Sequence, residues 1–186
     1  MWRGLAAGLI GGLVASWTMN RFQDVWLKLS EGGGESRGEQ SSQQGQRSGS
    51  KGQQQSGEEQ EDATVKAASA ISEGIFDHKL TKSEKKIAGP AVHYAFGTAV
   101  GGLYGATAEL APHVTAGAGL PFGAAFWLVA DEGAVPLLGL SKGPTEYPLS
   151  THVYALASHF VYGLTAEVAR RAVRAALWKW RAPRLV

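Results

Sequence analysis

The sequence predicts an all-α fold: a polytopic membrane helical bundle with about four transmembrane helices, and a long disordered loop between the first two. Four stretches contain no Asp, Glu, Lys or Arg, at 4–20, 87–108, 110–130 and 147–166. Each is close to the length of about 20 apolar residues that a helix needs to cross a bilayer. Soluble helices of this length would show a charged face at every turn.

The overall composition agrees with this class and excludes several others. The formal net charge is +2, so no charge excess indicates a nucleic-acid partner. The absence of Cys excludes a disulfide framework and a thiolate metal site. The mean hydropathy of −0.11 averages a very polar insert with a very apolar remainder. The alternative to a membrane bundle is a soluble bundle rich in Gly and Ala.

Residues 1–30 are predicted to form the first transmembrane helix, near 4–21, with an amphipathic extension. A signal peptide is the rival explanation, because Arg3 precedes the apolar run. No small-x-small cleavage site follows, since Trp17, Thr18 and Met19 stand at the end of the run. We therefore expect an uncleaved transmembrane helix.

Residues 31–62 form a Gln/Gly/Ser/Glu-rich segment without an apolar side chain. Such a segment cannot bury enough apolar surface to offset the entropy lost on ordering, so we expect a disordered loop. A membrane helical domain is predicted over 63–174. It begins with an interfacial helix over 63–80, which is indicated by apolar residues at helical spacing: Val65, Ala68, Ile71, Ile75 and Phe76.

Three further spans are predicted near 87–108, 114–138 and 148–168, followed by a basic amphipathic tail over 175–186. Basic residues after the last span favour a cytoplasmic C-terminus. A collar of four lysines before the second span argues for the opposite orientation; these are Lys79, Lys82, Lys85 and Lys86. If Pro121 and Pro136 make the third segment re-entrant, both basic clusters can be cytoplasmic.

Glycines recur every four residues in the first two predicted spans. Four-residue spacing places the missing side chains on one helix face, where two backbones can approach closely. We expect these stripes to hold spans one and two together, or to join two copies of the protein. They are Gly4, Gly8 and Gly12 in the first span, and Gly97, Gly101 and Gly105 in the second.

Ionisable side chains inside the apolar runs predict a buried polar network. Asp131 and Glu132 fall inside such a run, where a charge costs about 3 kcal/mol and needs a partner or a function. The alternative is that the third span ends at Ala130, so that the pair reaches the headgroups. Helical rise places His93, Asp131 and His152 at a similar depth, and His159 lies two turns from His152 on the same helix face. A second, interfacial group is predicted on the opposite side, formed by Glu109, His113 and Glu167.

Three interpretations of the buried group compete. The first is a hydrogen-bond network that locks spans two, three and four together. The second is a proton relay or sensor, because imidazole titrates near neutral pH. The third is a divalent metal site, which lacks a supporting ligand spacing such as HExxH. No nucleophile–base pair, phosphate-binding loop or dinucleotide fingerprint is present, so we predict no enzymatic activity, no cofactor and no bound metal.

Several short motifs over residues 63–174 together resemble the YagU-like family of bacterial inner-membrane proteins. The resemblance implies a multi-pass protein of the bacterial inner membrane and adds no reaction. The insert at 31–62 is not part of it. The motifs are Val92–Gly97, Gly102–Gly105, Asp131-Glu132, Pro136–Leu140, Pro144-Thr145-Glu146, His152, Ser158-His159, Val161-Tyr162, Glu167 and Arg170-Arg171.

Two classes of function follow from these patterns. In the first, the His–carboxylate group serves proton- or ion-coupled transport or a response to pH. In the second, the protein is a structural or assembly component that packs through its glycine stripes, and the polar groups serve only the fold. The predicted partners are the lipid bilayer and either a second copy of the chain or another membrane protein, with no nucleic acid.

Overall fold

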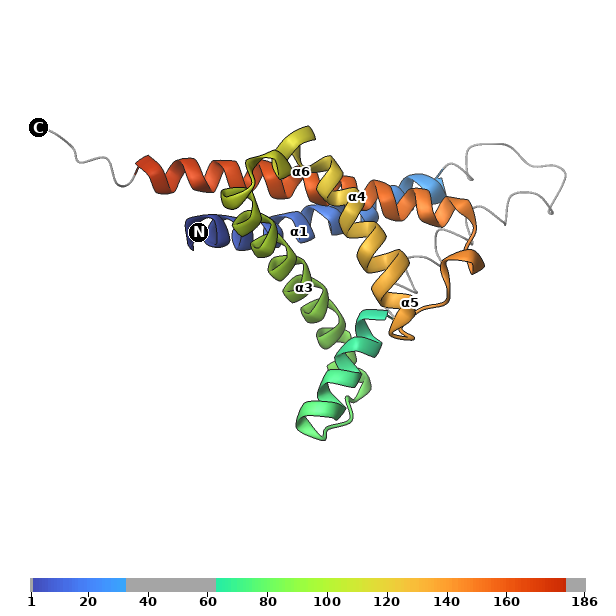
Figure 1. Ribbon diagram of the computed structural model, residues 1–186. Helices are drawn as coiled ribbons and strands as arrows, with labels where there is room; N and C mark the ends of the chain where they lie inside the picture. Colours follow the sequence, from blue (N-terminus) through green and yellow to red (C-terminus); the bar gives the residue numbers. More distant parts are fainter. Residues whose placement is uncertain (1, 33–62, 180–186) are drawn as a thin grey trace, which may run out of the picture. The chain divides into compact units, whose positions relative to one another are not determined.

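The computed structural model describes residues 2–32 and 63–179. These residues form helices joined by short irregular segments, and no strand occurs among them (Figure 1). The predicted all-α class is therefore confirmed for this part of the chain. The predicted disordered loop at 31–62 lies outside the described residues, apart from two residues that complete the first helix.

The elements follow one another in a simple order. The first is α1 (Trp2–Gly32), and after the undescribed segment comes a helix over residues 63–76. The remaining elements are α3 (Lys82–Leu110), the 3-10 segment η1 (Pro112–Gly119), α4 (Leu120–Val129), the π-helical turn η2 (Ala130–Ala134), α5 (Val135–Leu137), the 3-10 turn η3 (Pro144–Glu146) and α6 (Leu149–Lys179).

The chain divides into two compact units, which are described separately below. The first unit contains Met1–Met19, His93–Phe126 and His159–Val186. The second contains Asn20–Val92 and Trp127–Ser158. Because α1, α3, α4 and α6 each cross a unit boundary, every long helix contributes to both units.

In the first unit, the two glycine stripes of α1 and α3 face each other. A Cβ atom added to Gly8 would lie 2.8 Å from the Cα of Gly105. A Cβ added to Gly12 would lie 2.9 Å from the Cα of Gly101. Both distances are too short for real carbon atoms, so only glycine allows this backbone approach. In this structure the stripes pack against each other within one chain.

The core of the first unit lies where α1, α4 and α6 meet. A second close approach brings α4 to α6, since a Cβ on Gly123 would lie 3.4 Å from the Cα of Gly163. The core residues are Ala15, Met19, Tyr162 and Ala166, with Phe122 and Phe126 packed against them. The ring of Tyr104 from α3 stacks on Phe122, with 4.0 Å between ring centroids.

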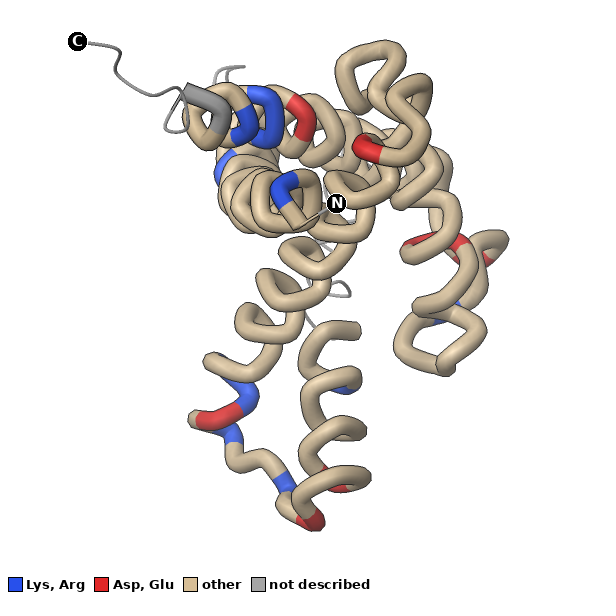
Figure 2. The backbone as a smooth tube through the Cα atoms, turned by 60° about the vertical axis from the view of Figure 1, so that its left-hand side comes forward, with Lys and Arg blue, Asp and Glu red and all other residues tan. Residues whose placement is uncertain are grey.

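In the second unit, the helix over 63–76 and the start of α3 form a hairpin. The two helices meet closely, because a Cβ on Gly89 would lie 2.8 Å from the side chain of Val65. Thr81 and Glu84 start α3 with a capping box: Glu84 N–H donates to Thr81 Oγ1, and Thr81 N–H donates to the Glu84 carboxylate at 2.7 Å. Charged residues of both signs gather at the turn (Figure 2). The predicted interfacial helix over 63–80 thus ends at residue 76, where Asp77 takes a positive φ of 50°.

One helical stretch of the described residues, Pro112–Leu137, is long and apolar enough to cross a membrane, with a mean hydropathy of 1.3. It corresponds to the predicted span at 114–138, but it is not one regular helix. Gly117, Ala118 and Gly119 have positive φ values of 65°, 55° and 87°, so a left-handed turn separates η1 from α4. The other predicted spans fall within α1, α3 and α6, and their crossing of a membrane stays a prediction. Of the predicted tail at 175–186, α6 includes the part up to Lys179, and the rest lies outside the described residues.

Candidate functional site

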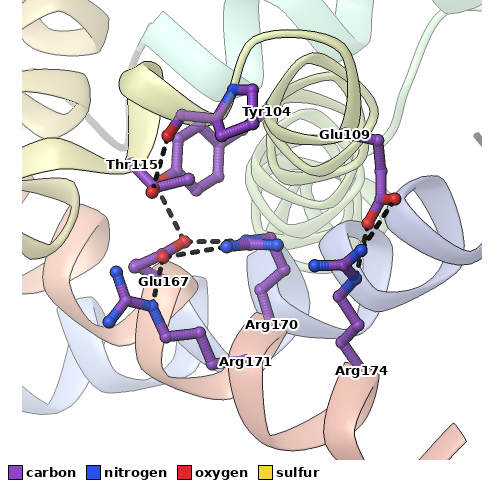
Figure 3. A network of polar contacts seen from close by, with 8 residues as sticks. Tyr104, Glu109, Thr115, Glu167, Arg170, Arg171 and Arg174 are labelled. Carbon is purple, nitrogen blue, oxygen red and sulfur yellow. Dashed lines mark hydrogen bonds and ion pairs between the residues drawn. The ribbon is translucent and has the colours of Figure 1, made fainter. Parts of the chain in front are cut away.

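The first polar centre is a buried glutamate in the first unit. Glu167 has only 1% of its surface exposed, yet it carries a carboxylate. Arg170 meets that carboxylate with two hydrogen bonds, Nε to Oε2 at 2.7 Å and Nη2 to Oε1 at 2.8 Å. Arg171 Nε donates to Oε1, and the Tyr104 hydroxyl donates to Oε2 at 2.9 Å (Figure 3). Both carboxylate oxygens of Glu167 therefore accept hydrogen bonds.

Helix geometry explains why these groups meet. Glu167, Arg170 and Arg171 are spaced i, i+3 and i+4 on α6, which places them on one face of the helix. The guanidinium of Arg170 also lies over the ring of Tyr104, 5.9 Å from its centroid. The carboxylate of Glu167 raises the pKa of Arg170 above its usual range through these hydrogen bonds, against the opposing effect of burial. The cluster is a fully paired charge network, with little capacity to exchange a proton.

A separate ion pair lies near this centre. Arg174 of α6 meets Glu109 at the end of α3, with Nε 2.7 Å from Oε1 and Nη2 3.1 Å from Oε2 (Figure 3). The sequence predicts one interfacial group formed by Glu109, His113 and Glu167. In the structure the two glutamates pair with different arginines, Glu167 is buried, and His113 is exposed. Of the basic residues that follow the last predicted span, Arg170, Arg171 and Arg174 are partners of carboxylates.

The second polar centre joins Glu132 and His152 in the second unit. His152 Nδ1 lies 2.7 Å from Glu132 Oε1, and His152 Nε2 lies 3.0 Å from the carbonyl oxygen of Pro144. The two side chains are 16% and 22% exposed, for Glu132 and His152 respectively. The edge of the His152 ring faces the ring of Tyr147, 6.4 Å away. Three segments thus meet at one imidazole: the π turn, the loop around η3, and α6.

The proton count of this centre follows from its acceptors. A carbonyl oxygen can only accept, so Nε2 must carry a hydrogen to bond to Pro144. The short Nδ1–Oε1 contact also requires one proton, because two lone pairs would repel each other at 2.7 Å. Both contacts of His152 are hydrogen bonds only when one proton lies between Nδ1 and Oε1, either as imidazolium and carboxylate or as imidazole and carboxylic acid. The net charge of the pair is zero in both forms, which suits partial burial.

The π-helical turn places Glu132 at this position. Pro136 has no N–H, so the α-helical bond to the carbonyl of Glu132 cannot form. The backbone widens instead, and Val135 N–H bonds to the carbonyl of Ala130, five residues earlier. Such π turns within helices are frequent at functional sites. The local sequence thus supplies the acid and, through Pro136, the missing helix bond beside it.

The residues of the predicted network fall in both units. His93 and His159 belong to the first unit, whereas Asp131, Glu132 and His152 belong to the second. His159 is buried, and its ring meets Phe126 edge-on at 5.1 Å. The His93 ring meets Tyr94 in the same way, at 5.6 Å. Among the described residues no group of three or more His, Cys, Asp or Glu is arranged to hold a metal ion.

Comparison with known proteins identifies a family but no activity. No curated protein and no solved structure matches this chain. Residues 68–168 match the family described as "Protein of unknown function (DUF1440)". The matched region covers more than half of the chain and contains Glu132, His152 and Glu167. It lies within residues 63–174, the region over which the sequence motifs resemble a known family. The chain therefore belongs to the DUF1440 family, whose function is unknown.

Proposed function

We propose that this protein is a multi-pass integral membrane protein of the YagU-like, bacterial inner-membrane type, in which Glu132 and His152 hold one exchangeable proton. The role is non-enzymatic: a response to pH, or transport coupled to protons. The observation that carries the proposal is the 2.7 Å contact between His152 Nδ1 and Glu132 Oε1, with Nε2 already committed to Pro144. Imidazole is the side chain whose charge changes between about pH 5 and about pH 8.

The surroundings of the pair support a membrane setting. Glu132 lies within the apolar stretch Pro112–Leu137. Large apolar side chains near it in sequence are exposed, including Leu128 at 58%, Val129 at 69% and Leu137 at 87%. Exposed apolar surface of this extent is typical of a lipid-facing or partner-facing surface. Carbonate washing of membranes tests this part directly: the protein should stay in the pellet, and its release would contradict the proposal.

The proton-coupled role is tested in proteoliposomes. The dissipation of an imposed pH gradient is measured for the wild-type protein and for Glu132→Gln, which keeps the shape of the side chain but cannot ionise. Glu73→Gln, an exposed position on the helix over 63–76, is the matched control. We expect flux in the wild type and the control, and its loss in Glu132→Gln.

A structural or assembly role is the second candidate. It is favoured by a row of exposed leucines on α1, Leu5, Leu9 and Leu13, spaced four apart, which suits contact with another helix. The same liposome assay separates the two roles. Equal gradients with and without folded protein would favour assembly over proton-coupled transport.

A further inference from the structure

We propose that loss of the proton shared by Glu132 and His152 releases the loop over residues 142–147 from α6, so that the pair acts as a proton-dependent latch. The inference rests on the proposed function and names how the same site is regulated. The juxtaposition that carries it is one imidazole between two acceptors: the carboxylate of Glu132 on one side and the carbonyl of Pro144 on the other.

The loop is organised by its own hydrogen bonds, so it can move as one piece. Gly143 N–H donates to Glu146 Oε1 at 3.0 Å, and Lys142 N–H donates to the Tyr147 hydroxyl at 3.2 Å. These bonds do not involve α6. The bond from His152 Nε2 to Pro144 connects this loop to α6. Just before the loop, Lys66 Nζ donates to the carbonyl of Leu140 at 3.3 Å, which ties the chain there to the helix over 63–76.

Removing one proton makes the two contacts of His152 incompatible. A neutral imidazole carries one N–H, and both of its neighbours are now acceptors. If the hydrogen is on Nδ1, it bonds to the Glu132 carboxylate and the lone pair of Nε2 faces the carbonyl of Pro144. If it is on Nε2, the lone pair of Nδ1 faces the carboxylate. One contact is therefore lost in either tautomer.

The contact to Glu132 is the one that survives. A hydrogen bond to an ionised carboxylate is about twice as strong as one between neutral groups. Facing a lone pair toward a carboxylate is also worse than facing it toward a neutral carbonyl, since the carboxylate carries a full charge. The hydrogen thus moves to Nδ1, and Nε2 and the carbonyl of Pro144 repel each other. The loop loses this hydrogen bond to α6, and the ring contact between Tyr147 and His152 stays as a weaker one.

Among the groups that surround His152, the pair of Glu132 and His152 is the one that we expect to respond to pH. Glu132 faces it from η2, with Asp131 next in the same turn, and Tyr147 faces it from the loop. Glu146 and Lys142 lie in the loop itself. Imidazole is the side chain among these types whose charge changes between about pH 5 and about pH 8. Release of the loop also uncovers the two partly buried side chains, so that proton loss and access to water become coupled.

Two substitutions of His152 separate its two contacts. His152→Gln places an amide donor near the position of Nε2, which retains the contact to Pro144 at any pH. His152→Asn places a donor near the position of Nδ1, which retains the contact to Glu132 and cannot reach Pro144. The chain has no Cys, so a spin label at Thr145→Cys, exposed in the loop, reports on this position alone. Ala70→Cys, exposed on the helix over 63–76, is the matched control site.

The label's mobility is measured in full-length protein at about pH 5 and about pH 8, the range over which imidazole titrates. We expect mobility to rise with pH in the wild type, to stay low in His152→Gln, to stay high in His152→Asn, and not to change at the control site. In parallel, nitrogen NMR of the histidine rings follows the His152 signal, which is identified by its disappearance in His152→Gln.

The two measurements distinguish failure of the latch from failure of the proton site. If the His152 ring loses its proton while the loop label stays immobile, the latch is wrong and the proton site stands. An immobile label in His152→Asn would also overturn the latch. If the His152 ring keeps the same protonation state over the pH range of the experiment, both the proposed function and the latch are wrong.

Discussion

The hydroxyl group of Tyr162 donates a hydrogen bond to the backbone carbonyl oxygen of Gly97, 65 positions earlier in the chain. Tyr162 lies on α6 and is 1% exposed, and Gly97 belongs to the glycine stripe of α3 that packs against α1. A single side chain thus links α6 to the contact between α1 and α3. The first unit is held by backbone approach and buried polar bonds as much as by apolar packing.

The first prediction concerns this bond. We expect Tyr162→Phe to lower the free energy of unfolding by about 1 kcal/mol, the usual net contribution of a buried hydrogen bond. Thermal unfolding in detergent measures the change. Thr107→Ala is the control, because its hydroxyl bonds only to the carbonyl of Leu103 one turn earlier in its own helix. An equal effect of the two variants would show that the link between α3 and α6 adds no stability.

The second prediction concerns the glycine stripes. A Cβ at Gly101 would lie 2.7 Å from the backbone N of Gly12, so Gly101→Ala must push α1 and α3 apart. We expect a loss of about 1–3 kcal/mol in unfolding free energy, typical of overpacking. Gly74→Ala is the matched control, since nothing lies within 4 Å of its added Cβ. There we expect a gain of about 0.5–1 kcal/mol, because alanine is the better helix former. A stabilising Gly101→Ala would refute the close approach.

The third prediction concerns the buried charges. Glu167→Gln leaves Arg170, which is 5% exposed, without its counter-charge. Breaking a buried ion pair from one side costs about 3–5 kcal/mol, so we expect a large fall in the unfolding midpoint. Asp24→Asn breaks an exposed ion pair with Arg21, 3.2 Å apart, and should cost at most about 1 kcal/mol. Comparable midpoints for the two variants would mean that water reaches Glu167.

The fourth prediction concerns acid pH. The backbone N–H of Thr81, with further hydrogen bonds from the Thr81 and His78 side chains, holds the pKa of Glu84 below its ordinary value of 4.5. A lowered folded-state pKa adds stability above the ordinary value, and this stability is lost as the pH falls through the folded-state value. We expect the first turn of α3 to lose hydrogen-exchange protection below about pH 4.5. In Glu84→Gln this loss should be absent, whereas Glu73→Gln should behave as the wild type does. Protection that is independent of pH in the wild type would contradict the capping role.

The contact between α1 and α3 could be predicted because their glycines recur every four residues. This spacing places all of them on one face of the helix. The contact between α4 and α6 could not, because Gly163 stands alone and its partners Gly119 and Gly123 straddle the start of α4. The helical rise gives the depth of a residue but not its direction around the helix. For this reason His93 shares an expected depth with His152 and still belongs to the other unit.

The sequence contains signals for two further features that were not predicted. The spacing of Glu167, Arg170 and Arg171 is that of an ion pair along one helix face, but the arginines also fit a basic end at a membrane surface. Pro136 four residues after Glu132 indicates a missing helix bond at that glutamate. The resulting π turn depends on how the whole segment packs, which local sequence does not determine.

The left-handed turn at 117–119 also sets the length of the helical segment that follows it. After it, ten residues of α4, five of η2 and three of α5 form an unbroken helical rod. At 1.5 Å per residue this rod is about 27 Å long, slightly short of a hydrocarbon layer about 30 Å thick. In a bilayer, such a mismatch is relieved by local thinning at a cost of fractions of a kcal/mol per Å. In the proposed membrane setting, lipid chain length would therefore act on the rod that carries Glu132, and thicker membranes would strain the segment that presents this carboxylate to His152.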